Sequence, residues 1–234
     1  MFAIETQNLS KKFDTHVAVN NLNLQVPSGS ICGFLGKNGA GKTTTIKMLV
    51  GLSRPSSGKI IIHGQERNYG KLDNRDIGYL PDVPNFYNYY SAGEYLDFCG
   101  KLYGMKKTER KNRIYELLDM VGLKDDKTPV TGYSRGMKQR LGIAQALMNS
   151  PRIIFLDEPI SALDPIGRRE IMQLIQSLRG SVTVFFSTHI FADDLSMLHQ
   201  MVPVLLYQSK VSLEHYQIYT PSLEDIFMEV TSNE

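Results

Sequence analysis

The sequence predicts an α/β fold with a largely parallel sheet. In the C-terminal half, short apolar runs alternate with helical patterns: a strand at residues 153–156, a helix after Pro165 and a strand at residues 182–187. Near the N-terminus, the glycine-rich segment 36–41 stands between an apolar run, residues 31–35, and a helical stretch. Strands separated by helices usually pair in parallel, because the helix carries the chain back over the sheet. These runs are therefore expected to share one sheet.

Roughly the first 65 residues are expected to be mainly sheet. Short β-type runs at residues 4–8, 22–26 and 59–63 are bounded by turn signals such as Pro27-Ser28-Gly29. One helix interrupts these runs, beginning at the glycine-rich segment and ending at Gly51.

The middle of the chain has a different pattern, which predicts a helical insert at about residues 86–150. Residues 91–94, Ser-Ala-Gly-Glu, have the spacing of a helix capping box. Apolar residues then recur at helical intervals, at Ile114, Leu117, Leu118 and Val121. Because the strand and helix patterns resume after the insert, residues 1–234 are expected to form a single domain.

The last part of the chain continues the strand and helix alternation. The patterns predict a short helix from Ile190, a strand at residues 202–207 and a terminal helix opening at residues 222–225, Ser-Leu-Glu-Asp.

Composition and charge exclude several classes of protein. The formal charge is only +2, and the basic residues are scattered along the sequence. No nucleic acid partner is therefore expected. No run of eighteen apolar residues occurs, and residues 1–5 lack an export signal, so we expect a cytoplasmic chain that does not itself cross a membrane. Cys32 and Cys99 lack metal-site spacing and are expected to be reduced structural thiols.

The strongest single motif is a P-loop, which fits the pattern G-x-x-x-x-G-K-[ST] between a strand and a helix. Glycines let backbone N–H groups curl around phosphate oxygens, and the helix N-terminus adds a positive dipole. The lysine supplies a charge for the β- and γ-phosphates, and the threonine hydroxyl is expected to hold Mg²⁺. We expect ATP to bind at this segment: Gly36, Lys37, Asn38, Gly39, Ala40, Gly41, Lys42, Thr43 and Thr44.

Two carboxylates end the strand at residues 153–156. In an enzyme with a P-loop, the first acid, Asp157, would hold the Mg²⁺ shell. The second, Glu158, lies one residue farther and could act as general base on the attacking water. Alone, such a pair is more often a solvated strand end, but beside a P-loop it favours catalysis.

Three further segments make the chain resemble the ATP-binding subunits of ATP-binding cassette (ABC) transporters. Residues 133–140, Tyr-Ser-Arg-Gly-Met-Lys-Gln-Arg, resemble the family's signature segment. Residues 161–164, Ser-Ala-Leu-Asp, resemble its D-loop, and His189 resembles its switch histidine. The order of the motifs is that of the family, so the resemblance covers nearly the whole chain.

The resemblance implies a fold and an arrangement of subunits. The expected fold is the P-loop NTPase fold of ABC ATPases, with a mostly parallel core sheet, an antiparallel β part and a helical subdomain. Two protomers, identical or different, would face head to tail, so that one protomer's signature touches the γ-phosphate held by the other's Lys42. The resemblance assigns catalysis to Glu158 and His189, adenine stacking to Phe13, and the signature contact to Ser134, Arg135, Gly136 and Met137.

The match departs from the family's pattern in two places. Asp82 stands where the Q-loop usually has glutamine, and an ionised carboxylate can reach Mg²⁺ or its waters but cannot donate a hydrogen bond. In the signature, Arg135 and Met137 replace a small and an amide residue, a variant that resembles the exporter-type branch for drugs and antibiotics.

The resemblance implies an ATP hydrolase that uses Mg²⁺ and drives a separate membrane-spanning permease, of the exporter type, from the inner face of the membrane. The alternative is a soluble ABC-type ATPase acting on the ribosome or nucleic acid, which a single cassette without a heptad array disfavours. The aromatic cluster is either an exposed docking surface for the permease or core for the helical insert: Phe86, Tyr87, Tyr89 and Tyr90.

Overall fold

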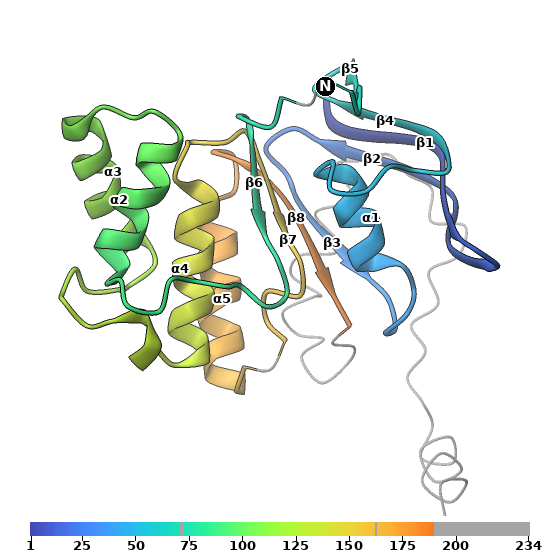
Figure 1. Cartoon of the computed structure of the whole chain (residues 1–234). Helices are drawn as coiled ribbons and strands as arrows, with labels where there is room; N and C mark the ends of the chain where they lie inside the picture. Colours follow the sequence, from blue (N-terminus) through green and yellow to red (C-terminus); the bar gives the residue numbers. More distant parts are fainter. Residues whose placement is uncertain (71–72, 162, 190–234) are drawn as a thin grey trace, which may run out of the picture. The chain divides into compact units, whose positions relative to one another are not determined.

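Within the residues that the structure describes, two four-stranded sheets form the framework of the computed structural model (Figure 1). The structure describes residues 1–70, 73–161 and 163–189. The helix, strand and terminal helix expected after residue 189 lie outside the described residues.

The first sheet is antiparallel and has the strand order β2-β1-β4-β5. Its strands are β1 (Phe2–Phe13), β2 (His16–Pro27), β4 (Ser57–Ile62) and β5 (Gln65–Glu66). β1 and β2 extend well beyond the predicted runs, and the short β5 was not predicted. The register of β1 on β2 shifts near Asn8 and Asn21, which both have left-handed backbone angles. Such irregularities break the two-residue alternation, so the sequence pattern detects only the regular parts.

The second sheet is parallel and has the strand order β3-β8-β7-β6, which confirms the predicted parallel core. Its strands are β3 (Ile31–Leu35), β8 (Thr183–Thr188), β7 (Ile153–Leu156) and β6 (Ile77–Leu80). β6 was not predicted as a strand, since it is short and contains Gly78. A Cβ added to Gly78 would lie 2.1 Å from the carbonyl oxygen of Ala146, so only glycine lets the helix pack this closely.

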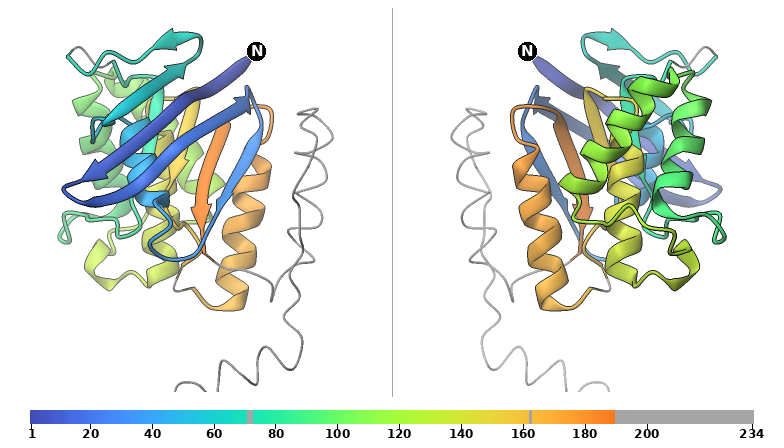
Figure 2. Two further views of the ribbon diagram at one scale, coloured as in Figure 1. Left: turned by 90° about the vertical axis from the view of Figure 1, so that its right-hand side faces the viewer. Right: turned by 90° about the vertical axis from the view of Figure 1, so that its left-hand side faces the viewer.

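Helices cover both faces of the parallel sheet. α1 (Lys42–Leu49) lies between the two sheets, whereas α4 (Arg135–Leu147) and α5 (Pro165–Ser177) lie on the opposite face of the parallel sheet (Figures 1 and 2). The core between the sheets joins Ile4 of β1, Ile46 of α1 and Phe155 of β7, all fully buried. This packing fixes the start of α1 against both sheets.

Between β6 and β7 the chain forms helices, as predicted. They are α2 (Ala92–Leu102), α3 (Lys107–Met120), the short 3₁₀ helix η1 (Val130–Gly132) and α4. The capping box of α2 is confirmed: Glu94 N donates to Ser91 Oγ, and Ser91 N donates to Glu94 Oε2. Arg110 of α3 donates to Asp97 of α2 and joins the two helices.

The two cysteines are free thiols, with Cys99 buried and Cys32 half-buried. Over residues 1–70, 73–161 and 163–189, no helix has the length and apolar composition that a bilayer span requires.

Candidate functional site

The glycine-rich loop leads directly from β3 into α1. Gly41 precedes the helix with φ 87°, in the left-handed region that favours glycine. A Cβ added there would lie 2.2 Å from the carbonyl oxygen of Ala18 on β2. Both facts require glycine at this position, which explains the second glycine of the motif. The loop therefore lies directly against the antiparallel sheet.

A cleft of about 490 Å³ opens over this loop. It brings together predicted residues from segments that are far apart in the sequence: Phe13, Asn38, Gly39, Gly41, Lys42, Thr43, Thr44, Asp82, Glu158 and His189. His16, Ala18 and Ser161 also line it, although none had an expected role there. Gly36, Lys37, Ala40 and Asp157 were predicted site residues, but they do not form its wall.

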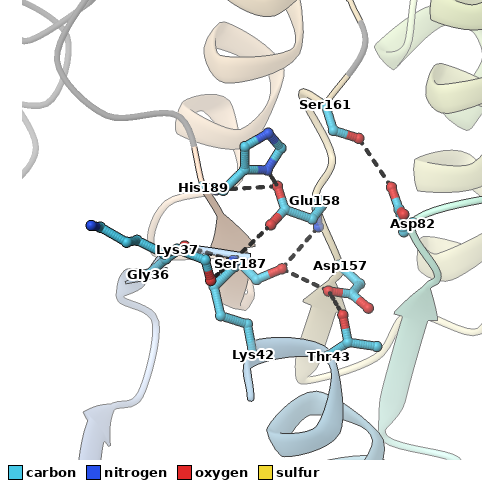
Figure 3. A network of polar contacts seen from close by, with 10 residues as sticks. All are labelled: Gly36, Lys37, Lys42, Thr43, Asp82, Asp157, Glu158, Ser161, Ser187 and His189. Carbon is cyan, nitrogen blue, oxygen red and sulfur yellow. Dashed lines mark hydrogen bonds and ion pairs between the residues drawn. The ribbon is translucent and has the colours of Figure 1, made fainter. Parts of the chain in front are cut away.

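Lys42 is buried at the base of the cleft and is held by three oxygens. Its Nζ donates to the carbonyl oxygens of Gly36 at 2.6 Å and Lys37 at 3.2 Å, and lies 3.2 Å from Glu158 Oε1 (Figure 3). Gly36 and Lys37 thus contact Lys42 through their backbone. The ammonium group lies against the backbone of the first two loop residues, and a carboxylate neutralises it.

Glu158 links Lys42 to His189. Its Oε2 lies 2.7 Å from His189 Nδ1 and accepts a hydrogen bond from the His189 backbone N–H (Figure 3). The residue has φ 50°, a left-handed conformation that is uncommon outside glycine, asparagine and aspartate. Its own N–H donates to Ser187 Oγ at 2.9 Å, which stabilises this turn. Uncommon backbone angles held by surrounding contacts are typical of functional positions.

Asp157 lies beneath the cleft, with 1% of its surface exposed. Its Oδ1 accepts hydrogen bonds from Ser187 Oγ at 2.7 Å and Thr43 Oγ1 at 3.1 Å. Burial raises the pKa of the Asp157 carboxyl above its usual value, and the two hydroxyl donors oppose that shift. Thr43 therefore connects the buried carboxylate to the cleft.

The donor set around Thr43 fits a magnesium ion that is bound together with phosphate. Among the described residues, no three His, Cys, Asp or Glu side chains are grouped as a metal site. Mg²⁺, however, is usually held by one or two carboxylates, waters and substrate phosphate oxygens rather than by a protein cage. The Thr43 hydroxyl and the Asp157 carboxylate are hard oxygen donors in direct contact. They suit this mode of binding.

Asp82 lies beside this network and accepts a hydrogen bond from Ser161 Oγ at 3.0 Å (Figure 3). Both residues line the cleft, and both also line an adjoining groove of about 400 Å³. The groove is bordered by Phe86 of the aromatic cluster and by Arg135.

The signature residues lie away from the P-loop cleft. Ser134 precedes α4, and its Oγ accepts a hydrogen bond from Met137 N at 3.2 Å. Ser134, Arg135, Gly136 and Met137 line a different cleft of about 690 Å³, beside Asp164. One chain therefore contains the two halves of a potential site in different clefts, and Arg135 also borders the groove that adjoins the P-loop cleft.

Two residues that sequence reasoning missed are important in this geometry. Ser187 is fully buried and bridges Asp157 to Glu158. A serine at the end of an otherwise apolar strand was the available signal for it. His16 pairs with Phe13 across a two-residue turn. The polar pair Asp14-Thr15 between two β-type runs was the signal there.

The variant Asp157→Asn is expected to stabilise the metal-free protein. The folded-state pKa of Asp157 is raised, so ionisation costs stability as the pH rises above its usual value of 3.8. Asparagine keeps an acceptor for both hydroxyls but carries no charge. We expect a higher unfolding midpoint at pH 7 in EDTA, on the order of 2–4 °C.

Scanning calorimetry measures this difference, which should shrink as the pH falls toward 3.8, where aspartate also becomes neutral. A lower midpoint for Asp157→Asn at pH 7 would mean that the carboxylate is stabilised where it lies.

A family model and several known proteins match this chain in sequence. The family model described as "ABC transporter" matches residues 19–161. The bacitracin transport ATP-binding protein BcrA of Bacillus licheniformis is 45% identical over 194 residues, which cover 81% of this chain and 62% of that protein. The lantibiotic transport ATP-binding protein SrtF of Streptococcus pyogenes is 37% identical over 226 residues, covering 96% and 95%.

A solved structure shares the fold and shows a dimer. The ATP-binding cassette MJ0796, in a dimeric post-hydrolysis state bound to ADP and Pi, matches with a TM-score of 0.70 and 28% identity, covering 83% of this chain and 89% of that one.

Four relatives that are 41% to 45% identical to this chain are longer than it is: the chain spans between 54% and 66% of their lengths.

Proposed function

The chain belongs to the ABC transporter family, and from this premise we propose that it is the ATP-binding and ATP-hydrolysing subunit of a transporter with a separate membrane-spanning permease. The main support for this proposal is that Lys42, Glu158 and His189 meet in one cleft, next to the Thr43–Asp157 pair. A phosphate cradle, a carboxylate base and oxygen donors for a metal are the parts that phosphoryl transfer to water requires.

The Lys42–Glu158 ion pair suggests how nucleotide would prepare the site. In the structure the pair neutralises itself at 3.2 Å. A triphosphate in the cleft offers Lys42 a stronger set of anionic oxygens. Lys42 would then turn from Glu158 to the phosphates, and the freed carboxylate could accept a proton from water. Binding of substrate thus releases the base.

His189 would orient the general base. Its Nδ1 and its backbone N–H both contact Glu158 Oε2, so the glutamate side chain stays near the switch segment when Lys42 leaves. The strained backbone of Glu158, supported by Ser187, also fixes where the carboxylate can point. The bound Mg²⁺ would supply charge neutralisation of the phosphates, held by Thr43 and Asp157. Asp82 also lines the cleft and could contact waters bound to the ion.

The separation of the two clefts favours action as a dimer. The signature residues of one chain do not reach its own P-loop cleft, so a second protomer, identical or different, would supply them. Closure on ATP and opening after hydrolysis would convert chemical into mechanical work. The dimeric state of MJ0796 supports this arrangement.

The permease partner is proposed to be of the exporter type. The names of BcrA and SrtF state transport of bacitracin and of a lantibiotic by those systems. In the aromatic cluster Tyr87 and Tyr89 are 49% and 70% exposed, while Phe86 packs edge-on against Tyr95. The cluster is therefore anchored on α2 and also presents rings to solvent, which suits a docking surface.

The partner can be identified by affinity capture. A tagged Glu158→Gln protein, incubated with Mg·ATP and detergent-solubilised native membranes, should retain a protein with several membrane spans. Lys42→Ala bait is the matched control and should retain less of it. Ribosomal proteins or nucleic acid captured without any membrane protein would instead support the alternative function, and the transporter assignment would fail.

A further inference from the structure

His16 stands beside Phe13 on the wall of the cleft. The two residues are direct cross-strand partners on either side of the turn Asp14-Thr15. Directly opposite side chains in an antiparallel pair lie on the same face of the sheet, with Cβ atoms about 4.5–5.5 Å apart. The imidazole and the phenyl ring therefore line the same end of the cleft.

The position of His16 along β2 places it away from the phosphate cradle. Ala18 lies two residues farther along β2, also lines the cleft, and has its carbonyl oxygen against Gly41. A β-strand advances by about 3.3 Å per residue, so His16 lies about 7 Å along β2 from this contact with the P-loop. A nucleotide with its terminal phosphates on the P-loop would extend its sugar and base over such a distance. His16 is thus level with the nucleoside.

A lysine contacts one face of the Phe13 ring. Lys11 Nζ lies 4.8 Å from the centre of its ring and donates to the carbonyl oxygen of Arg54 at 2.7 Å. One face of Phe13 is therefore occupied by an anchored cation. The opposite face of the Phe13 ring is available to stack on a base. His16 lies next to Phe13 in the cleft.

His16 itself is available for a ligand. Its side chain is exposed, and within the part of the chain that the structure describes, no hydrogen bond or ion pair involves its ring. A neutral imidazole carries one N–H donor and one acceptor. It can therefore bind a ribose hydroxyl or the edge of a base.

We propose that His16 forms a hydrogen bond to the nucleoside part of the bound nucleotide and, together with Phe13, sets the preference for the base. This inference rests on the proposed function of the cleft as a nucleotide site. It adds a specificity residue that acts on the nucleoside and leaves the phosphates to Lys42.

The test compares ligands with and without a nucleoside. Titration calorimetry measures the dissociation constants of Mg·ADP, Mg·GDP and Mg·pyrophosphate for the wild type and for His16→Ala. We expect ADP binding to weaken by about 3- to 10-fold, the usual effect of one hydrogen bond, with pyrophosphate binding unchanged. The ratio of ADP to GDP affinity should also change. His16→Gln, which keeps a donor and an acceptor, should recover part of the ADP affinity.

Thr15→Ala, in the same turn but outside the cleft lining, is the matched control and should bind all three ligands like the wild type. Equal weakening of ADP and pyrophosphate binding in His16→Ala would overturn the proposal, as would unchanged ADP binding or a similar loss in Thr15→Ala. A wild type that binds neither ADP nor pyrophosphate would refute the proposed function of the cleft instead.

Discussion

Glu158→Gln is expected to lower the rate of ATP hydrolysis by about 100- to 10,000-fold, the range for loss of a general base. Glutamine has nearly the same shape, and its carbonyl oxygen can still accept from the His189 N–H or face Lys42. It cannot take a proton from water. The negative charge beside Lys42 also disappears, so phosphate binding should be as tight as in the wild type or tighter.

Two measurements check this prediction. Phosphate release under saturating Mg·ATP gives the turnover, and light scattering with Mg·ATP reports whether the variant accumulates as an ATP-bound dimer. Glu66→Gln removes an exposed carboxylate that pairs with Lys59 on the antiparallel sheet, and it should hydrolyse ATP at the wild-type rate. Turnover of Glu158→Gln within tenfold of the wild type would remove Glu158 from the role of base.

Local patterns in the sequence predicted much of the fold. Three strands of the parallel sheet, β3, β7 and β8, are short and apolar, so their patterns are read without knowledge of the tertiary structure. The capping box of α2 depends only on Ser91 and Glu94. β1 and β2 were predicted too short because irregular register hides their periodicity. β6 was missed because its identity as a strand depends on pairing with β7 and on the close approach of α4 to Gly78.

The candidate site was also predicted only in part from the sequence. The P-loop and the acid pair at Asp157 and Glu158 follow from motifs, since each motif is contiguous in the chain. The ion pair between Lys42 and Glu158 joins the start of α1 to the end of β7, and no local pattern predicts it. Ser187 is similar, because its role comes from contacting the two acids that follow the neighbouring strand β7. Contacts between distant segments require the structure.

Lys42→Ala is expected to weaken Mg·ADP binding by about 10- to 100-fold, as for the loss of a hydrogen bond to a charged group. Two effects contribute. The variant lacks the ammonium group that contacts the P-loop backbone, and it leaves Glu158 with His189 as its remaining partner in the cleft. The carboxylate has then lost its lysine partner and repels phosphate, so part of the loss belongs to Glu158 rather than to the missing lysine.

A double-mutant cycle separates the two effects. Calorimetric titration of Mg·ADP into Lys42→Ala/Glu158→Gln should show tighter binding than into Lys42→Ala alone, because the double variant no longer places an unpaired charge beside the phosphates. Lys47→Ala, an exposed lysine of the same helix, is the control and should bind like the wild type. If the double variant binds no better than the single one, the ion pair does not oppose nucleotide entry, and release of Glu158 by the substrate is not part of the mechanism. If Lys42→Ala alone binds like the wild type, the cleft does not hold phosphate through this lysine.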